Sequence, residues 1–359
     1  LNHYALFVTF FPHLLAGPIV HHRELIPQFF IKNESGHEIT QWAIGITVIS
    51  FGLFKKLIMA DALADYANQV FSAASRGVDI SASEAWLGVL SFNLQVYFDF
   101  SGYCDIACGS ALLFGITLPQ NFLSPFKAVN IIDYWKYWHI TLSRFITSYV
   151  YTPLMRNTPG GTLFSKAMLI TLISMGISGL WHGANWTFIF WGLAHGALLV
   201  TNHCWRKTPF SRTIANVKIF RASSILLTYI MVTLTMVLFR SPDLVSAHHF
   251  YNALFDLDSF RFTHQIQQPV ISDLCRQLSL ELSPMQKILP VIIFMHAWVW
   301  LLPNLQQVMA GRNALIKANI PNTKLLWKDN FYWALLAALA LSASIMSLNI
   351  SSDFVYFQF

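Results

Sequence analysis

The run SKAMLITLISMGISGLWHGANWTFIFWGLAHGALLVTNH, residues 165–203, carries a single Lys or Arg, Lys166, and no acidic residue. Its apolar parts, 165–181 and 186–203, are each slightly shorter than the ~20 residues that a spanning helix needs. A short segment, HGAN, separates them. This pattern predicts two membrane-spanning helices joined by a tight turn, with one ionisable ring, His182, at the junction.

The composition extends this prediction to the whole chain. Hydrophobic residues make up 55% of the 359 positions and charged residues 11%, and the mean hydropathy is +0.49. A soluble globular protein has about 25% charged residues. We therefore expect one all-α domain over 1–359, a polytopic transmembrane bundle surrounded by lipid. Four more apolar runs are typical of spans: 42–60, 223–239, 288–303 and 331–350.

Two other apolar regions are interrupted by polar or helix-breaking residues. Pro12 and Gly17 interrupt 5–19, and Asp99, Gly102 and Asp105 interrupt 86–118. Irregular backbone at membrane depth is tolerated only where protein or water covers it. We therefore expect broken or re-entrant helices in both regions.

The distribution of basic residues predicts the topology. The chain has a net charge of +6, and its Lys and Arg residues gather in the loops 203–222 and 304–330 and in the stretch 124–166, which we place in the cytoplasm. The balanced loop 240–287 is expected outside, as is the C-terminus. Before residue 86 the signs conflict, so that part is left unassigned. The sequence contains no basic stripe on a polar helix, so nothing in it indicates nucleic-acid binding.

Metal and redox chemistry have weak support. The cysteines, Cys104, Cys108, Cys204 and Cys275, form no CxxC pair and are best read as small apolar packing residues. The adjacent histidine pairs lie in loops, and no HExxH, G-x-S-x-G or P-loop motif is present. We expect no metal.

His139 and His182 are the leading candidates for chemistry. Trp135, Trp138, His139 and Leu142 follow helical spacing, which predicts His139 on an aromatic face, where a packing role is the commoner one. His182, beside Gly183, suits a general base near neutral pH. The residues alone leave open the alternative of an interfacial histidine in an aromatic belt.

Two further patterns have structural explanations. GLWHG at 179–183 is echoed by GLAHG at 192–196. On one continuous helix turning ~100° per residue, His182 and His195 would face different ways, so we do not expect a paired site. Asp99 is predicted to cap a helix or join a polar network more readily than to orient a catalytic histidine.

At these residues the sequence resembles the membrane-bound O-acyltransferase (MBOAT) family, in its bacterial alginate O-acetylase-like branch. The matching segments are YALFVTFFPHLLAGPI (4–19), YFDFSGYCDIACGSALLFGITLPQNF (97–122), DYWKYWHITLSRF (133–145), GLWHGANWTFIFWGLAHG (179–196) and FVYFQF (354–359). The resemblance implies an acyl-transfer histidine at His182 and a second motif histidine at His139. It also implies that helices preceding Leu1 are missing, whereas the end of the chain looks natural.

The resemblance further implies transfer of an acetyl group from a cytoplasmic thioester, such as acetyl-CoA, to an exported polysaccharide, as in alginate biosynthesis, at a bacterial inner membrane. It implies a periplasmic esterase-like acetyltransferase as partner and no tightly bound cofactor. Lys136 and Arg144 are candidates for holding an anionic donor. The remaining candidates for substrate binding are Asp99, Trp181 and Asn185.

The sequence also departs from the family's pattern. YVYTPLMRNTPGG (149–161) replaces the usual YLYIPLGGNR, and Phe145 stands where the family has tryptophan, which puts donor recognition in doubt. Two alternatives therefore remain. One is a D-alanyl transferase of the teichoic-acid type. The other is a transporter with histidine proton relays, for which an inverted repeat is expected and not found.

Overall fold

The computed structural model describes residues 2–30, 37–214, 217–260, 283–310 and 323–348. Within these ranges the regular structure is helical, and four helices are long and apolar enough to cross a membrane. The principal α-helices are α1 (Asn2–Thr9), α2 (His22–Leu25), α3 (His37–Phe54), α4 (Asp61–Ser75), α5 (Ala82–Leu113), α6 (Ile131–Tyr137), α7 (Ile140–Ile146), α8 (Thr152–Asn157), α9 (Leu163–His182), α10 (Trp186–Trp205), α11 (Pro209–Ile214), α12 (Lys218–Arg240), α13 (Leu244–Phe255), α15 (Pro284–Leu301), α16 (Leu305–Met309) and α17 (Phe331–Met346). The all-α membrane fold expected from composition is confirmed.

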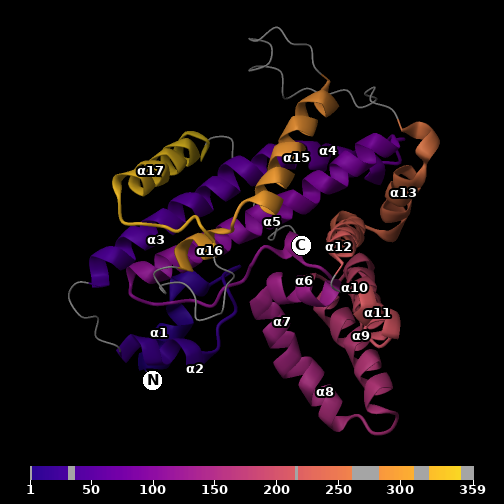
Figure 1. Cartoon of the computed structure of the whole chain (residues 1–359), viewed down its shortest axis with the longest axis horizontal. Helices are drawn as coiled ribbons and strands as arrows, with labels where there is room; N and C mark the ends of the chain where they lie inside the picture. The colour runs from indigo at the N-terminus through magenta and orange to yellow at the C-terminus, as the bar shows by residue number, and fades with distance from the viewer. Residues whose placement is uncertain (1, 31–36, 215–216, 261–282, 311–322, 349–359) are drawn as a thin grey trace.

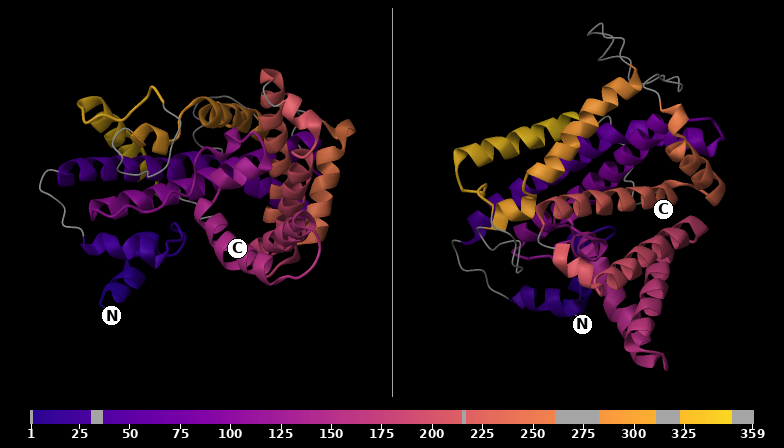
Figure 2. Two further views of the ribbon diagram at one scale, coloured as in Figure 1. Left: turned by 60° about the horizontal axis from the view of Figure 1, so that its bottom comes forward. Right: turned by 45° about the vertical axis from the view of Figure 1, so that its right-hand side comes forward.

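A long layer of helices forms one half of the molecule. Helix α3 continues through a π-helical turn, Lys55–Ala60, into α4. Helix α5 runs beside both, α15 crosses them, and α17 lies along α3 (Figures 1 and 2). The side chains of α5 are almost all buried, so this helix forms the centre of the core.

The expected break within 86–118 is wrong for most of its length, because α5 is one uninterrupted helix to Leu113. Its start is fixed by a capping box between Ser81 and Glu84. Gly102 lets it pass close to α3, since a Cβ there would lie 2.7 Å from the carbonyl oxygen of Gly52. The glycine thus serves helix packing instead of breaking the helix. The break expected in 5–19 is confirmed, with α1 followed by a separate 3-10 turn, Phe11–His13.

The second half contains the helical hairpin predicted from 165–203. Helix α9 ends at His182, and Asn185 caps α10 by accepting from the backbone N–H of Thr187. The two helices cross at Gly179 and Gly192. A Cβ at Gly192 would lie 2.2 Å from the carbonyl oxygen of Met175, and one at Gly179 would lie 2.1 Å from that of Phe188. The backbones therefore touch, as in other small-residue crossings in membranes.

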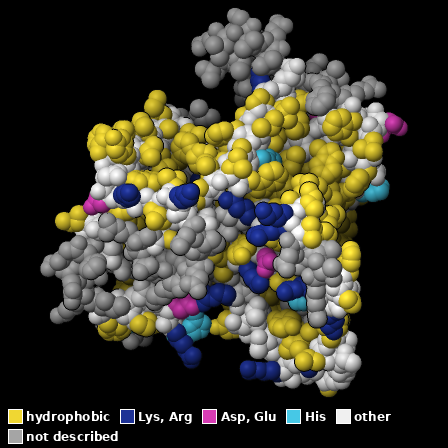
Figure 3. All heavy atoms as spheres, viewed as in Figure 1, with side chains coloured by type: hydrophobic (Ala, Val, Ile, Leu, Met, Phe, Trp, Pro, Cys, Tyr) yellow, Lys and Arg dark blue, Asp and Glu magenta, His cyan; other side chains and the backbone are white. Residues whose placement is uncertain are grey.

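The surface agrees with a membrane environment. Leu169, Ile173 and Leu180 of α9 are exposed, as are Leu336 and Leu339 of α17. Figure 3 shows Lys and Arg side chains gathered near the middle of one face, with hydrophobic side chains along its edges. Such a division suits an aqueous face surrounded by a lipid-facing rim.

Candidate active site

His139 lies at a break between two short helices, and the single helix predicted around it is wrong. Helix α6 ends at Tyr137 and α7 begins at Ile140. His139 has a left-handed backbone, with φ of 42°, which costs a residue with a Cβ about 1–2 kcal/mol. The break turns the ring into the core, where it meets Phe100 edge-on at 4.8 Å between ring centroids. The predicted aromatic surroundings are therefore present, in a different geometry.

Asn121 fixes the protonation pattern of His139. The Asn121 side-chain oxygen accepts from the backbone N–H of Thr141 at 3.2 Å and from its hydroxyl at 3.0 Å. The same oxygen lies 3.1 Å from His139 Nδ1. Since this oxygen can only accept, Nδ1 carries the proton and Nε2 of a neutral ring carries the lone pair. The second motif histidine is thus held as a hydrogen-bond acceptor at Nε2.

His182 occupies the end of α9, next to the turn of the hairpin. Its ring stands perpendicular to Trp191 at 5.2 Å and packs on Phe239 of α12 at 5.1 Å. Unlike His139, which is buried, His182 is partly exposed. It also lies close enough to His139 for the two rings to interact electrostatically. The structure therefore brings the two motif histidines to one site.

A third histidine, His195, belongs to the same cluster, and the prediction that the GLWHG and GLAHG echo makes no paired site is wrong. The two rings would face different ways on one continuous helix, whereas the chain reverses between α9 and α10 at Gly183–Asn185. The ring of Trp191 contacts His182 at 5.2 Å and His195 at 4.8 Å. The echo therefore places one histidine on either side of a shared tryptophan.

Charged residues within the helical layer are paired with each other. Lys55 Nζ lies 2.6 Å from a carboxylate oxygen of Asp105, whose other oxygen accepts from Gln306 at 2.7 Å. Lys56 Nζ lies 2.9 Å from Asp99 and 3.0 Å from Asp61. Asp99 is thus placed in a polar network. The pairing also explains why the charged residues before residue 86 gave conflicting predictions of the topology. Lys55 and Lys56 are paired with aspartates inside the helical layer, so their charges do not indicate which side of the membrane this part faces.

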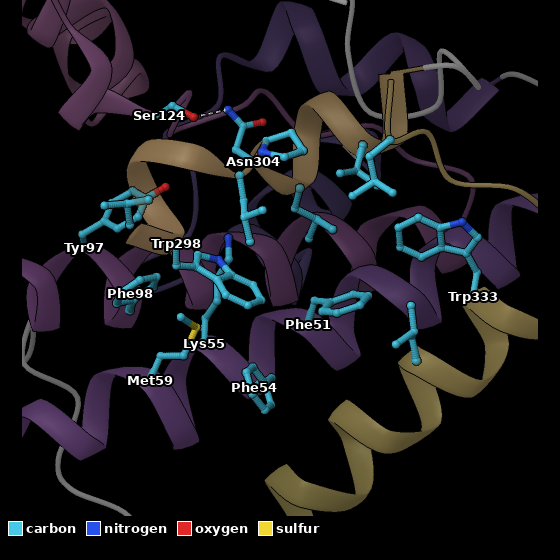
Figure 4. Close-up of a pocket in the computed structure, with 17 residues that line it drawn as sticks. Phe51, Phe54, Lys55, Met59, Tyr97, Phe98, Ser124, Trp298, Asn304 and Trp333 are labelled. Carbon is cyan, nitrogen blue, oxygen red and sulfur yellow. Dashed lines mark hydrogen bonds between the residues drawn. The ribbon is translucent and has the colours of Figure 1, made fainter. Parts of the chain in front are cut away.

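The cavity of about 240 Å³ beside this network is apolar. Figure 4 shows Lys55 entering it among Phe51, Phe54, Trp298 and Trp333. At one end Asn304 donates to the hydroxyl of Ser124 at 2.7 Å. None of the three clustered histidines lines this cavity, so it is distinct from the candidate active site.

The other predicted site residues lie around the histidines without converging on them. Lys136 is exposed and pairs with Asp133 at 2.9 Å, and Arg144 pairs with Glu24. Trp181 is exposed and packs on Phe145. Asn185 Nδ2 donates to the carbonyl oxygen of Pro242 at 2.7 Å. The two basic residues remain accessible for an anionic donor, whereas Asn185 shapes the hairpin turn.

Among the described residues, no group of three or more His, Cys, Asp or Glu side chains is placed to hold a metal ion. Cys104 and Cys108 are buried free thiols and Cys204 is an exposed one. Cys275 and the segment 349–359, which includes FVYFQF, lie outside the described residues.

Comparison with known proteins identifies the family. The model of the membrane-bound O-acyltransferase family matches residues 1–240, which include all three clustered histidines. The chain belongs to this family. A peptidoglycan O-acetyltransferase of Helicobacter pylori is 42% identical over 265 residues, covering 73% of this chain and 48% of that protein. A probable alginate O-acetylase of Azotobacter vinelandii is 37% identical over 254 residues, covering 70% of this chain and 47% of that protein.

A more distant relative of this MBOAT chain is a teichoic acid D-alanyltransferase of Streptococcus thermophilus, 25% identical over 254 residues, covering 67% of this chain and 61% of that protein. The chain spans about half the length of the two O-acetyltransferase relatives. The predicted resemblance to the alginate O-acetylase-like branch is confirmed.

Several members of the site were missed from the sequence of this MBOAT protein. Asn121 lies in the quoted PQNF segment but gave no signal of its own, because its role depends on the break at His139. His195 was signalled by the echo and set aside. Trp191 looked like an ordinary apolar residue of a spanning helix, and only the hairpin places it between two histidines.

Proposed function

We propose that this protein is an O-acyltransferase that moves an acetyl group from a cytoplasmic thioester to an exported polysaccharide. The observation that carries the proposal is the proximity of His139 and His182, which lie close enough to interact electrostatically, with His182 partly accessible. In this proposal His139 approaches from the cytoplasmic stretch 124–166 and His182 from the outer turn of the hairpin. Their proximity suits a reaction with substrates on both sides of a membrane.

His182 serves in this proposal as the general base. It accepts the proton of a hydroxyl, whose oxygen attacks the thioester carbonyl carbon. The carbon–sulfur bond then breaks, and His182 returns the proton to the leaving thiolate, so that an ester and a free thiol are the products. A positioned base contributes about 10²–10⁴-fold to such a transfer.

His139 has a more restricted part. Because its Nδ1–H is donated to Asn121, Nε2 of the neutral ring accepts hydrogen bonds and cannot donate one to a carbonyl. This favours orienting a hydroxyl or thiol over polarising the thioester. Asn121, itself held by Thr141, acts as the residue that positions the ring.

The donor is proposed to arrive at the basic face seen in Figure 3. Lys136 and Arg144 are exposed and suit the phosphate groups of coenzyme A or of an acyl carrier protein. The acceptor is proposed to be peptidoglycan or an alginate-like glycan, because the relatives named above are O-acetyltransferases and O-acetylases of these polymers. We also propose that the protein lies in a bacterial inner membrane and acts with a periplasmic esterase-like partner for final transfer.

Replacement of His182 by alanine tests the proposal. We expect at least a hundredfold loss of O-acetyl groups on the exported polysaccharide, at equal membrane expression. His203→Ala, on the same hairpin, is the matched control and should retain acetylation. Unchanged acetylation in the His182 variant would remove this ring from the chemistry.

D-alanyl transfer is the second candidate, favoured by the similarity to a teichoic acid D-alanyltransferase. The two activities are separated by feeding cells labelled acetate or labelled D-alanine. Label from acetate in the exported glycan, lost with His182→Ala, supports acetyl transfer. Label from D-alanine in the exported glycan, lost with His182→Ala, would instead support D-alanyl transfer.

A further inference from the structure

His195 is fixed in one tautomer by its neighbour on α12. The hydroxyl of Thr235 donates to the carbonyl oxygen of Val232 at 2.6 Å. That hydroxyl has one proton, so its 2.9 Å contact with His195 Nε2 must use a proton on the ring. Nε2 of His195 therefore carries the hydrogen, and Nδ1 of the neutral ring presents a lone pair.

Three buried polar atoms of this cluster have no hydrogen-bond partner among the residues that the structure describes. They are His195 Nδ1, Trp191 Nε1 and Trp135 Nε1. Their rings contact one another, with centroids 4.8 Å apart for Trp191–His195, 5.3 Å for Trp135–His195 and 6.0 Å for Trp135–Trp191. Buried polar groups are nearly always satisfied in folded proteins. This set, two N–H donors and one acceptor, therefore indicates a ligand group.

One member of the cluster, Trp135, lies beside a space that a substrate can occupy. Trp135 lines a cavity of about 150 Å³ together with Ser143, Thr147 and Ser174, whose hydroxyl is also buried without a partner among the described residues. Along α10, His195 lies between the hairpin turn and the end followed by Arg206 and Lys207. The basic residues at that end predict that it faces the cytoplasm. A donor that enters from the cytoplasm therefore passes His195 before it reaches His182.

We propose that His195, Trp135 and Trp191 form a subsite that binds the amide of the donor's pantetheine arm. A secondary amide is the complement of this cluster: its carbonyl accepts from the indole N–H groups, and its N–H donates to His195 Nδ1. Coenzyme A and acyl carrier proteins share such an amide, two methylene groups from the thioester sulfur. Trp191 also touches His182, so an amide held here leaves the thioester beside that ring. The inference rests on the proposed thioester donor and adds a specificity-determining residue, His195.

The test compares two acetyl donors in inside-out vesicles from cells making the full-length protein. One donor is S-acetyl-N-acetylcysteamine, which has the amide. The other is the acetyl thioester of pentane-1-thiol, which has a similar length and no amide. We expect the unmodified protein to prefer the amide donor by about ten- to hundredfold in kcat/KM, measured as thiol release that depends on His182.

His195→Phe is expected to reduce that preference to within about threefold of unity, whereas His195→Gln, which keeps an acceptor, retains part of it. His203→Ala should keep the full preference.

A preference that survives His195→Phe, or an equal loss with both donors, would overturn the subsite and make His195 a packing residue. If His195→Phe does not fold, Trp191→Phe and Trp135→Phe remove one N–H each and must lower the same ratio. Absence of transfer from either donor by the unmodified protein would instead contradict the proposed function itself.

Discussion

Two polar regions inside this membrane protein differ in how their groups are satisfied. In the layer of α3, α4 and α5, each lysine is paired with at least one aspartate, and Gln306 completes the coordination of Asp105. In the cluster around α9 and α10, the polar atoms belong to neutral rings, and several have no partner among the described residues. In the first region the charged groups are satisfied by one another, whereas in the second the unpartnered ring nitrogens are available to a ligand.

This difference separates two reasons for placing ionisable residues at membrane depth. Intramembrane charges are functional candidates by default, yet a complete set of partners shows that Lys55 and Asp105 can hold helices together without any substrate. The histidines meet a stricter criterion, because His139 and His182 lie at chain breaks and the ring nitrogens of His139 and His195 are oriented by Asn121 and Thr235. The pairing of charged groups, more than burial, distinguishes the scaffold from the active-site candidate.

The largest expected effect on stability comes from breaking a charge pair of the first region. Asp105→Ala leaves the Lys55 ammonium without its partner, which for buried pairs costs about 3–5 kcal/mol. Thermal unfolding in detergent should show a large fall in Tm, and transfer per folded molecule should remain. The double variant Lys55→Met with Asp105→Leu is expected to regain most of the lost stability. A stable single variant with no transfer would move this pair into the chemistry and end the distinction.

A smaller effect is expected at the oriented histidine. Asn121→Leu deprives His139 Nδ1 and the N–H of Thr141 of their common acceptor, at about 1–3 kcal/mol for such buried groups. The rate of transfer should fall about tenfold or more because the ring loses its fixed tautomer, while KM for the donor changes little. Steady-state kinetics in vesicles measure this split. An unchanged kcat in a folded variant would show that His139 does not need orientation.

The smallest effect on stability is expected at the exposed pairs. Arg144→Ala removes a surface contact with Glu24, and such pairs contribute about 0–1 kcal/mol. If Arg144 binds the donor, KM for acetyl-CoA should rise several-fold with little change in kcat, and more strongly at low salt. Glu24→Ala is the control, because it removes the same pair and keeps the cation. Equal KM values in both variants would remove Arg144 from donor binding.

The sequence predicted four of the spans because hydrophobic length reports directly on membrane crossing. The runs 42–60, 165–181, 223–239 and 288–303 fall on helices that are long and apolar enough to cross a membrane. The run 186–203 and the run that begins at 331 form α10 and α17, which are not among these helices in the described part of the chain. The prediction was wrong where a tertiary contact decides the local structure. Asp99 and Gly102 look like helix breakers in isolation, yet Lys56 in the π-helical turn after α3 pairs with Asp99, and the backbone of Gly52 packs against Gly102, within one continuous helix.

In the candidate site, too, the prediction was wrong where tertiary contacts decide the local structure. His139 and His182 were found through motifs, but Trp135 to Leu142 were read as one helix because spacing alone does not reveal a left-handed residue. Helical periodicity does not predict the position of His195 relative to His182, because the chain reverses between them. Periodicity describes a single element, and the contacts of Trp191 arise only when two elements fold back on each other.

The backbone of His139 has a consequence for any effort to make this protein more robust. Replacing it by glycine or asparagine would relax the left-handed residue, since both tolerate that region better than other residues. The backbone energy regained, about 1–2 kcal/mol, is smaller than the cost of emptying the space that this buried ring fills and of leaving Asn121 without it. Selection for durability and selection for turnover therefore keep the same residue at this one position.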